Sequence, residues 1–220
     1  MSSLLSPRPE VQVNATSGKV PASVRRLCDL AYLERSIHRI LCGWGNQFYA
    51  WQDKVAVCRH IWDQACIVER LRQRIGQFPG IEPDAPVSQE LETLANTVLL
   101  APGFEDAVDG VYQILNTALV HAYLDFIQQV HAIHDAPTHQ IIQEIVTIKD
   151  MQRRWRGDYR RRQPHTVDAA YLDRIQAQLR VVDHLAKPRR AVHSRWVRFP
   201  PAGPVRAATY GRTAHGRFRR

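Results

Sequence analysis

Apolar residues recur at intervals of three and four along most of this chain, which is the spacing of helices with one buried face. The first such stretch runs from Ser23 to Gly43, and the second from Asp53 to Ile75. A long connection through residues 78–86 leads to a shorter helical stretch, Gln89–Leu100, with Ser88 as its expected N-cap. The pattern therefore predicts two long helices followed by a short one.

Two further long helices are predicted in the second half, over Phe104–Ile133 and Pro137–Arg162, with a break at residues 135–138 between them. A short helix follows over Val167–Leu185. Alternation of apolar and polar residues, the mark of strands, is scarce, so the predicted fold class is all-α. Long helices joined by one long and one short connection favour a four-helix bundle made of two hairpins.

The apolar spacing also predicts which face of each helix is buried. For the second helix the expected inward residues are Val57, Ile61, Ala65, Val68, Leu71 and Ile75. For the third they are Val108, Val111, Leu115, Ala118, Ala122, Phe126 and Val130. For the fourth they are Ile141, Ile145, Ile148, Gln152 and Trp155.

The ends of the chain differ from its middle. Residues 1–22 are polar and proline-containing, so we expect a flexible leader, then a bundle over 23–162, then an extension over 163–220. From Ala186 onward there is no acidic residue, and an extended or partly disordered tail is expected. No apolar run reaches the ~18–20 residues that cross a membrane, and the leader lacks an apolar signal core, so a cytoplasmic protein is expected.

Charge separates the chain into two parts. Residues 1–150 hold 12 Lys and Arg against 17 Asp and Glu, whereas residues 151–220 hold 18 against 4. The net charge of +9 therefore resides entirely in the last third, beyond an acidic bundle.

The four cysteines have no metal-type spacing. Because each falls inside a predicted helix, they are expected to be reduced thiols that act as small buried hydrophobes. They are Cys28, Cys42, Cys58 and Cys66.

Glu34 is the most informative polar residue, because it interrupts the apolar stripe of the first helix. A carboxylate in a buried stripe is costly unless another group compensates its charge. The neighbours that define this stripe are Leu27, Leu30, Ala31, Ile37 and Leu41.

Three segments carry a resemblance to a known family, over roughly residues 23–160. They are Leu33-Glu34-Arg35-Ser36-Ile37-His38-Arg39, Arg59-His60-Ile61-Trp62-Asp63-Gln64-Ala65, and Asp135-Ala136-Pro137-Thr138 leading into Lys149-Asp150-Met151-Gln152 and Trp155. In this pattern the chain resembles ferritin-like four-helix bundles, in particular a group of bacterial proteins of unknown function.

The resemblance implies a metal centre whose ligands this chain has largely lost. Metal-containing members carry a Glu on the first helix, which Glu34 matches, and a Glu-x-x-His pair on the second and fourth helices. The positions of those pairs are occupied by Gln64 with Ile67 and by Lys149 with Gln152. The ligand from the third helix falls on Asn116 or Gln113. No metal cofactor is therefore expected, with iron or manganese as the alternative.

Lys149 suggests how Glu34 is stabilised without metal. We expect its ammonium group to form a buried ion pair with the Glu34 carboxylate, so that Glu34, Gln64, Lys149 and Gln152 make a buried polar centre. The alternative is that Lys149 extends out of the end of the bundle into solvent.

An altered metal site is a second alternative. Imidazole and carboxylate groups on facing helices can bind zinc or iron. The candidate ligands are Glu34, His60, Asp63 and His121.

Arginines crowd the end of the fourth helix and have Trp155 and Tyr159 among them. Guanidinium groups interleaved with rings suit nucleic acid, an acidic protein surface, or contacts within the protein itself. This basic arm consists of Arg153, Arg154, Arg156, Arg160, Arg161 and Arg162.

Together these features predict a scaffold or protein-interaction module, with a protein partner or a second copy and no membrane. The alternatives are a metal-dependent oxidase or oxygenase and a nucleic-acid-binding protein that uses the arginine-rich C-terminal region. That region comprises the basic arm and the later runs Arg195-Trp196-Val197-Arg198-Phe199 and Arg217-Phe218-Arg219-Arg220. The chain has no G-x-S-x-G motif and no glycine-rich phosphate loop, which disfavours serine hydrolase and nucleotide-binding chemistry.

Overall fold

The computed structural model describes residues 22–130, 135–182 and 185. The chain divides into two units, Met1–Pro188 and Arg189–Arg220, and every described residue lies in the first. Across these residues the secondary structure is helical and contains no strand, which confirms the all-α prediction. The predicted leader before residue 22 and the predicted tail from Ala186 lie outside the described residues.

Three long helices and one composite helix form the frame of the unit. The composite helix consists of α4, a π-helical turn η2, and α5, which follow one another without a break. In chain order the elements are α1 (Ala22–Trp44), η1 (Gly45–Gln47), α2 (Trp51–Ile75), α3 (Gln89–Leu99), α4 (Phe104–Asp109), η2 (Gly110–Leu115), α5 (Asn116–Gln129), α6 (Ala136–Arg162) and α7 (Ala169–Val181).

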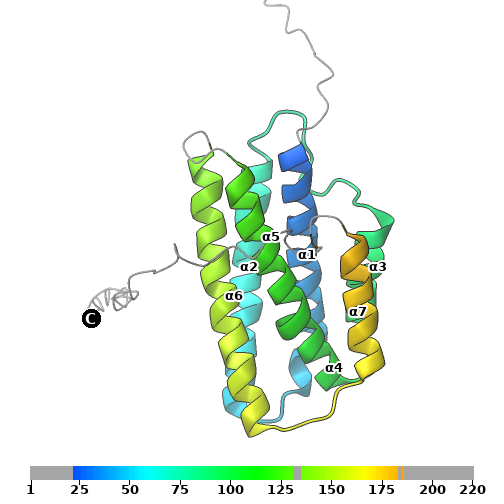
Figure 1. The fold of residues 1–220 in the computed structure, drawn as a ribbon. Helices are drawn as coiled ribbons and strands as arrows, with labels where there is room; N and C mark the ends of the chain where they lie inside the picture. Colours follow the sequence, from blue (N-terminus) through cyan, green and yellow to red (C-terminus); the bar gives the residue numbers. More distant parts are fainter. Residues whose placement is uncertain (1–21, 131–134, 183–184, 186–220) are drawn as a thin grey trace, which may run out of the picture. The chain divides into compact units, whose positions relative to one another are not determined.

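The long helices lie side by side (Figure 1). α1 packs against α2, α2 against α6, and α6 against α5 and η2. α5 is linked back to α1, because Arg26 donates to the Gln129 side chain and Tyr123 donates to Glu34. The shorter helices form an outer layer, in which α3 packs on α1 and α7 packs on α3 and η2. This arrangement leaves an interior that all four long helices line.

The predicted helix ends agree closely with the observed ones. The Ser88 side chain caps α3 by accepting from the backbone N–H of Leu91 at 3.4 Å. α7 is shorter than predicted, since Asp168 caps its start and Val182 is extended. The chain is already extended at Val130, so the third helix ends before the predicted Ile133, which is not a described residue.

The π-helical turn η2 was not predicted, because its wider turn leaves no clear mark in apolar spacing. It changes which residues of α5 face inward. Leu119 and Tyr123 are fully buried, whereas Ala118, which the spacing places in the core, is only half-buried. Ala122 and Phe126 are buried as predicted, so the departure right after η2 is confined to Ala118.

The buried face of α2 also differs from the prediction. His60, Gln64 and Ile67 point inward, while the expected Ile61, Ala65 and Val68 are half-buried. Apolar spacing misplaces this face because two polar side chains find hydrogen-bond partners inside. The same happens in α6, where Lys149 is buried, whereas Ile141 and Ile148 lie partly at the surface.

None of the helices built from the described residues is long and apolar enough to span a bilayer.

The outer helix α7 fits onto η2 at a glycine. A Cβ atom at Gly110 would lie 2.7 Å from the Tyr171 hydroxyl and 3.3 Å from Ile175 Cδ1. Tyr171 and Ile175 are both buried against η2, so either side chain would have to shift to admit the extra methyl group. The absence of a side chain at Gly110 therefore sets how closely α7 approaches η2.

We predict that Gly110→Ala lowers the free energy of unfolding by about 1–3 kcal/mol, because it overpacks this contact. The matched control is Gly157→Ala in α6, where a Cβ would meet only Arg161 Nη1 at 3.9 Å. That control should raise stability by about 0.4–1 kcal/mol. Urea unfolding of both variants measures the two effects, and equal effects of the same sign would contradict the packing argument.

Candidate functional site

A cluster of hydrogen-bonded polar side chains lies in the interior, where the long helices meet. Its members are almost completely shielded from solvent, which is rare for charged residues unless they are paired. We call it the central network, and it consists of Glu34 from α1, Gln64 from α2, Asn116 and Tyr123 from α5, and Lys149 and Gln152 from α6.

Lys149 is the centre of this network. Its Nζ lies 2.5 Å from Glu34 Oε2, 3.1 Å from Gln64 Oε1 and 3.0 Å from Asn116 Oδ1. An ammonium group has three N–H donors, so these three acceptors use its full capacity. The predicted ion pair with Glu34 is present, and with 0% of the Lys149 side chain exposed the alternative of a solvent-reaching lysine is wrong.

Glu34 is held by donors from three other helices. Its Oε2 accepts from Lys149 and from Gln64 Nε2, and its Oε1 accepts from the Tyr123 hydroxyl at 3.1 Å. Gln64 Nε2 also donates to the Glu34 backbone oxygen at 2.9 Å. Both carboxylate oxygens are therefore satisfied, as the burial of a charge requires.

Asn116 connects the ion pair to Gln152. Its Nδ2 donates to Gln152 Oε1 at 3.1 Å, while its Oδ1 accepts from Lys149. Of the two candidates on the third helix, Asn116 is the one inside the network, because Gln113 is exposed and accepts from Arg156 instead. Gln152 Nε2 is buried and has no partner among the described residues, which costs about 1–3 kcal/mol.

Burial dominates the protonation equilibria of the network. Removal from water lowers the pKa of Lys149, and the Glu34 carboxylate acts in the opposite direction. Burial, followed by the negative charge of Glu34, raises the pKa of Tyr123 well above its usual value. Tyr123 thus stays a neutral donor to the carboxylate.

The composition of the central network does not fit the di-iron centre of the ferritin-like family. Such a centre needs several carboxylates and two imidazoles around two dications. Here Glu34 supplies the one carboxylate, and a positively charged ammonium lies against it. The part of the chain that the structure describes has no group of three or more His, Cys, Asp and Glu side chains able to hold a metal ion.

The residues of the alternative metal site are not brought together. His60 Nδ1 lies 2.9 Å from the Tyr112 hydroxyl, and the His60 ring packs edge-on against Trp155. Asp63 accepts from Arg59 on its own helix at 2.9 Å, and His121 is exposed. Glu34 shares no described metal-ligand cluster with any of them.

His60 is nevertheless part of the electrostatics of the interior. Burial lowers its pKa to about 4, and the positive charge of Lys149 acts in the same direction. The imidazole is therefore neutral at physiological pH.

The basic arm mostly binds acidic side chains of the same protein. Asp109 of α4, which is buried, accepts from Arg156 Nε at 2.8 Å and also pairs with Arg160. Asp53, buried at the start of α2, pairs with Arg162 at 2.5 Å. Removing these arginines would leave two carboxylates buried without a counter-charge.

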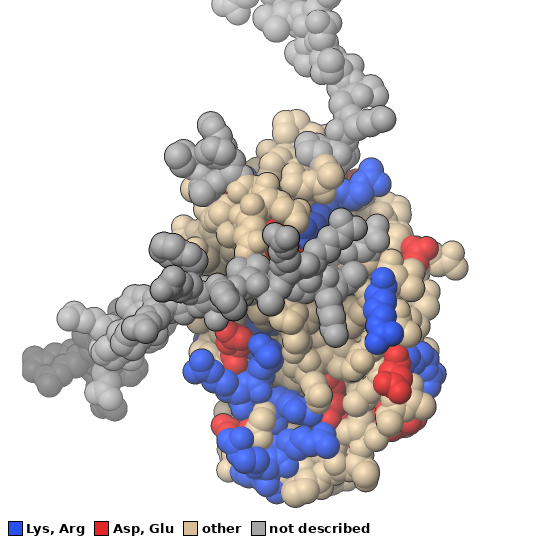
Figure 2. All heavy atoms as spheres, viewed as in Figure 1, with Lys and Arg blue, Asp and Glu red and all other residues tan. Residues whose placement is uncertain are grey.

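The remaining arginines of the arm lie closer to solvent. Arg153 pairs with Asp150 at 3.2 Å, Arg161 pairs with Asp158, and Arg154 is exposed. Figure 2 shows Lys and Arg side chains gathered at the lower end of the molecule, where α6 ends in Figure 1. Because five of the six arginines lie against an aspartate, the charge of this surface is largely neutralised.

The rings among these arginines are packed inside. Tyr159 stacks on Trp155 with ring centroids 5.4 Å apart, and Phe48 meets Phe104 edge-on at 4.6 Å. The Tyr159 hydroxyl also donates to Glu105 at 3.2 Å. Tyr159 is thus buried and Trp155 half-buried against other rings, which leaves little of their faces for stacking with bases.

The cysteines are less buried than predicted. Cys42 and Cys58 are exposed, Cys28 and Cys66 are half-buried, and all four are free thiols. The expectation that all four are core residues is therefore wrong.

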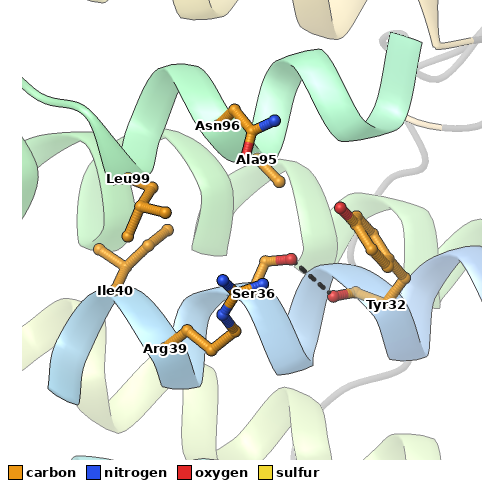
Figure 3. A pocket seen from close by; sticks show the side chains of 7 residues that line it. All are labelled: Tyr32, Ser36, Arg39, Ile40, Ala95, Asn96 and Leu99. Carbon is orange, nitrogen blue, oxygen red and sulfur yellow. Dashed lines mark hydrogen bonds between the residues drawn. The ribbon is translucent and has the colours of Figure 1, made fainter. Parts of the chain in front are cut away.

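No described pocket opens onto the central network. Figure 3 shows a pocket between α1 and α3, lined by Tyr32, Ser36 and Arg39 on one side and by Asn96 on the other. Its volume of about 10 Å³ is the space of one water molecule. A larger pocket of about 320 Å³ lies between α3 and α7, where Tyr171 and Arg174 line it.

Sequence reasoning found most of the network but missed Tyr123. Tyr123 follows Asn116 by seven residues, which is two helical turns, so the two side chains share a face. That spacing was the available signal, although a tyrosine at this position also fits an ordinary apolar core.

Comparison with known proteins found no matching family model, no matching curated protein and no matching solved structure.

We predict that Lys149→Met lowers the free energy of unfolding by about 3–5 kcal/mol at neutral pH, because it leaves the Glu34 carboxylate buried and unpaired. The double variant Glu34→Leu with Lys149→Met should lose less free energy of unfolding than Lys149→Met alone, since it removes both buried charges. Urea unfolding followed by circular dichroism measures both. An unchanged midpoint for Lys149→Met would contradict the buried ion pair.

We also predict that the protein loses stability as pH falls, because His60 is buried in its neutral form. The folded-state pKa of about 4 lies below the ordinary value of 6.5, so between these values the unfolded chain binds one more proton. Stability from this group is thus present above pH 6.5 and is lost as pH falls towards 4, by about 3 kcal/mol in total.

The control is His60→Gln, which keeps a polar partner for Tyr112 and cannot titrate in this range. The free energy of unfolding of His60→Gln minus that of the wild type should increase by about 3 kcal/mol between neutral pH and pH 4, because only the wild type loses stability from His60. Parallel pH profiles of the two proteins would show that His60 is not the group responsible.

Proposed function

We propose that this chain is a ferritin-like four-helix bundle in which the central network takes the place of the di-metal centre, and that it acts as a scaffold or protein-interaction module. The observation that carries the proposal is the ammonium of Lys149, which is hydrogen-bonded to groups from α1, α2 and α5 at the position where ligands would converge. A protein partner or a second copy is the expected binding partner.

The distribution of the network over the helices supports this proposal. A ferritin-like centre takes one ligand from each of two helices and a pair spaced by three residues from each of the other two. Glu34 and Asn116 are the single residues here. The pairs are Gln64 with Ile67 on α2 and Lys149 with Gln152 on α6, and Ile67 is buried like the others.

A scaffold role follows from what the network does physically. In a metal-containing bundle the dications hold the inward carboxylates together; here hydrogen bonds and one ion pair join the same helices. A buried and largely satisfied polar network favours one packing arrangement over its alternatives. Such a bundle folds without loading a cofactor, and none of the described pockets leads a substrate to its centre.

The nucleic-acid alternative receives little support from the basic arm. Buried aspartates form ion pairs with Arg156, Arg160 and Arg162, so the charge of these arginines is compensated within the protein. Binding through the phosphate backbone depends on cations that are free to replace counterions. Arg153, Arg154 and Arg161 are exposed, and two of these three lie beside surface aspartates. The arginines of residues 186–220 lie outside the described residues.

The proposal is tested by rebuilding the centre. The variant carries Gln64→Glu, Ile67→His, Asn116→Glu, Lys149→Glu and Gln152→His, with Glu34 unchanged. We predict that it binds about two ferrous or cobaltous ions per chain, as a di-metal bundle does, whereas the wild type binds well below one. Plasma mass spectrometry after anaerobic loading gives the stoichiometry, and visible Co(II) absorption bands report protein ligation.

Two results would count against the proposal. Near-stoichiometric metal in the wild type, purified without a histidine tag, would show that the centre is not replaced. A rebuilt variant that circular dichroism shows to be helical, yet binds no metal, would show that these six positions do not converge as in a ferritin-like bundle.

A further inference from the structure

An apolar stripe lies exposed on the outer side of α2, opposite to the face that lines the interior. Trp51 is 78% exposed, Val55 50% and Trp62 64%, and Cys58 between them is also exposed. The four residues follow one another at intervals of four, three and four, so they form one continuous line along the helix. We call this line the α2 stripe.

The described helices leave this face of α2 without a covering layer. α3 packs on α1, and α7 packs on α3 and η2, so the outer layer lies over other helices. The inward face of α2 is already occupied by His60, Gln64 and their neighbours. Two large indole rings in water are unusual for a helix whose other side is fully packed.

The size of the exposed surface fits a protein interface. Tyr49, two residues before the start of α2, is 96% exposed and adds to this apolar surface. Taking ~150–250 Å² for each aromatic side chain, the stripe with Tyr49 offers roughly 500–700 Å² of apolar surface. A stable interface buries about 800 Å² on each partner, so this surface supplies most of one, and polar neighbours supply the rim.

The arrangement of large and small residues fits a second copy of the same helix. Trp51 and Trp62 stand at the two ends of the stripe, and the smaller Val55 and Cys58 stand between them. When two such stripes pack antiparallel about a two-fold axis, each Trp51 meets Trp62 of the other copy, and the small residues let the helices approach. Spacing of four and three is also that of helix pairs with interlocking side chains.

The charged side chains that flank the stripe are Lys54 and Arg59. Arg59, which borders the stripe, is neutralised by Asp63 at 2.9 Å on the same helix. Two copies therefore do not bring these arginines together without a counter-charge.

We infer that the α2 stripe is a homodimer interface, in which the stripes of two copies pack antiparallel about a two-fold axis between Val55 and Cys58. This inference gives the proposed interaction module its surface and its partner, and it rests on that proposed function.

The first test is the oligomeric state of the full chain by sedimentation equilibrium, from nanomolar to high micromolar concentration. The wild type should form a dimer, and Trp51→Lys with Trp62→Lys should weaken it by about a hundredfold or more, as loss of two aromatic anchors does. The matched control is Leu100→Lys, because Leu100 is 77% exposed but lies outside the stripe at the end of α3. Its dimer should be unchanged.

A second measurement fixes the location of the interface. In a Cys42→Ser background, which removes the other exposed thiol, a short bismaleimide should cross-link two copies, and adding Cys58→Ser should abolish the product. The Trp51→Lys, Trp62→Lys protein should lose it too, while keeping its helical circular dichroism.

A wild type that stays monomeric throughout, or a dimer that the tryptophan substitutions leave unchanged, overturns the inference. Metal content measured on the same preparations separates the two proposals. A metal-free monomer refutes the α2 interface alone, whereas a metal-loaded dimer refutes the replaced centre alone.

Discussion

The ion pair between Lys149 and Glu34 is the constraint on which the interior depends. A single buried charge would be strongly destabilising, so each of these two residues is acceptable only because the other lies 2.5 Å away. Gln64, Asn116 and Tyr123 then satisfy the remaining donors and acceptors. Because these partners come from four different helices, the pairing also fixes how the helices are rotated about their axes. In α2 and α6 this places Gln64 and Lys149 in the buried face, while Ile61 and Ile148 are half-buried.

A second set of charges closes the lower end of the same interior. Asp53 and Asp109 are buried and accept from arginines near the end of α6. Four rings pack together in the same region: Phe48 after η1, Phe104 of α4, and Trp155 and Tyr159 of α6. In both regions a cation neutralises a buried carboxylate, but the two cations differ in their exposure to water. At the centre a lysine is surrounded by acceptors and excluded from water. At the end, arginines reach in from the surface with their long side chains and keep part of the guanidinium hydrated.

These arrangements shape the function that the protein can perform. The long helices enclose the central network, and none of the described pockets reaches it. On the surface the strongest feature is the α2 stripe, which is apolar, while the basic arm is largely neutralised by aspartates. The interior and the stripe lie on opposite faces of α2, so the helix that contributes Gln64 to the network also presents Trp51 and Trp62 to solvent.

The sequence by itself determined the helices and their approximate ends, and it predicted the pairing of Glu34 with Lys149 beside the alternative of a solvent-reaching lysine. Helix spacing, Ser88 as a cap and the break at residues 135–138 are local signals, and a charged residue within an apolar stripe demands an opposite charge wherever the chain folds. Only the tertiary structure decided the turn η2, the choice of Asn116 over Gln113, the role of Tyr123, and the pairing of the arginines with Asp53 and Asp109. Each of these depends on contacts between residues far apart in the chain, and local spacing carries no information about which distant partner a polar side chain will find.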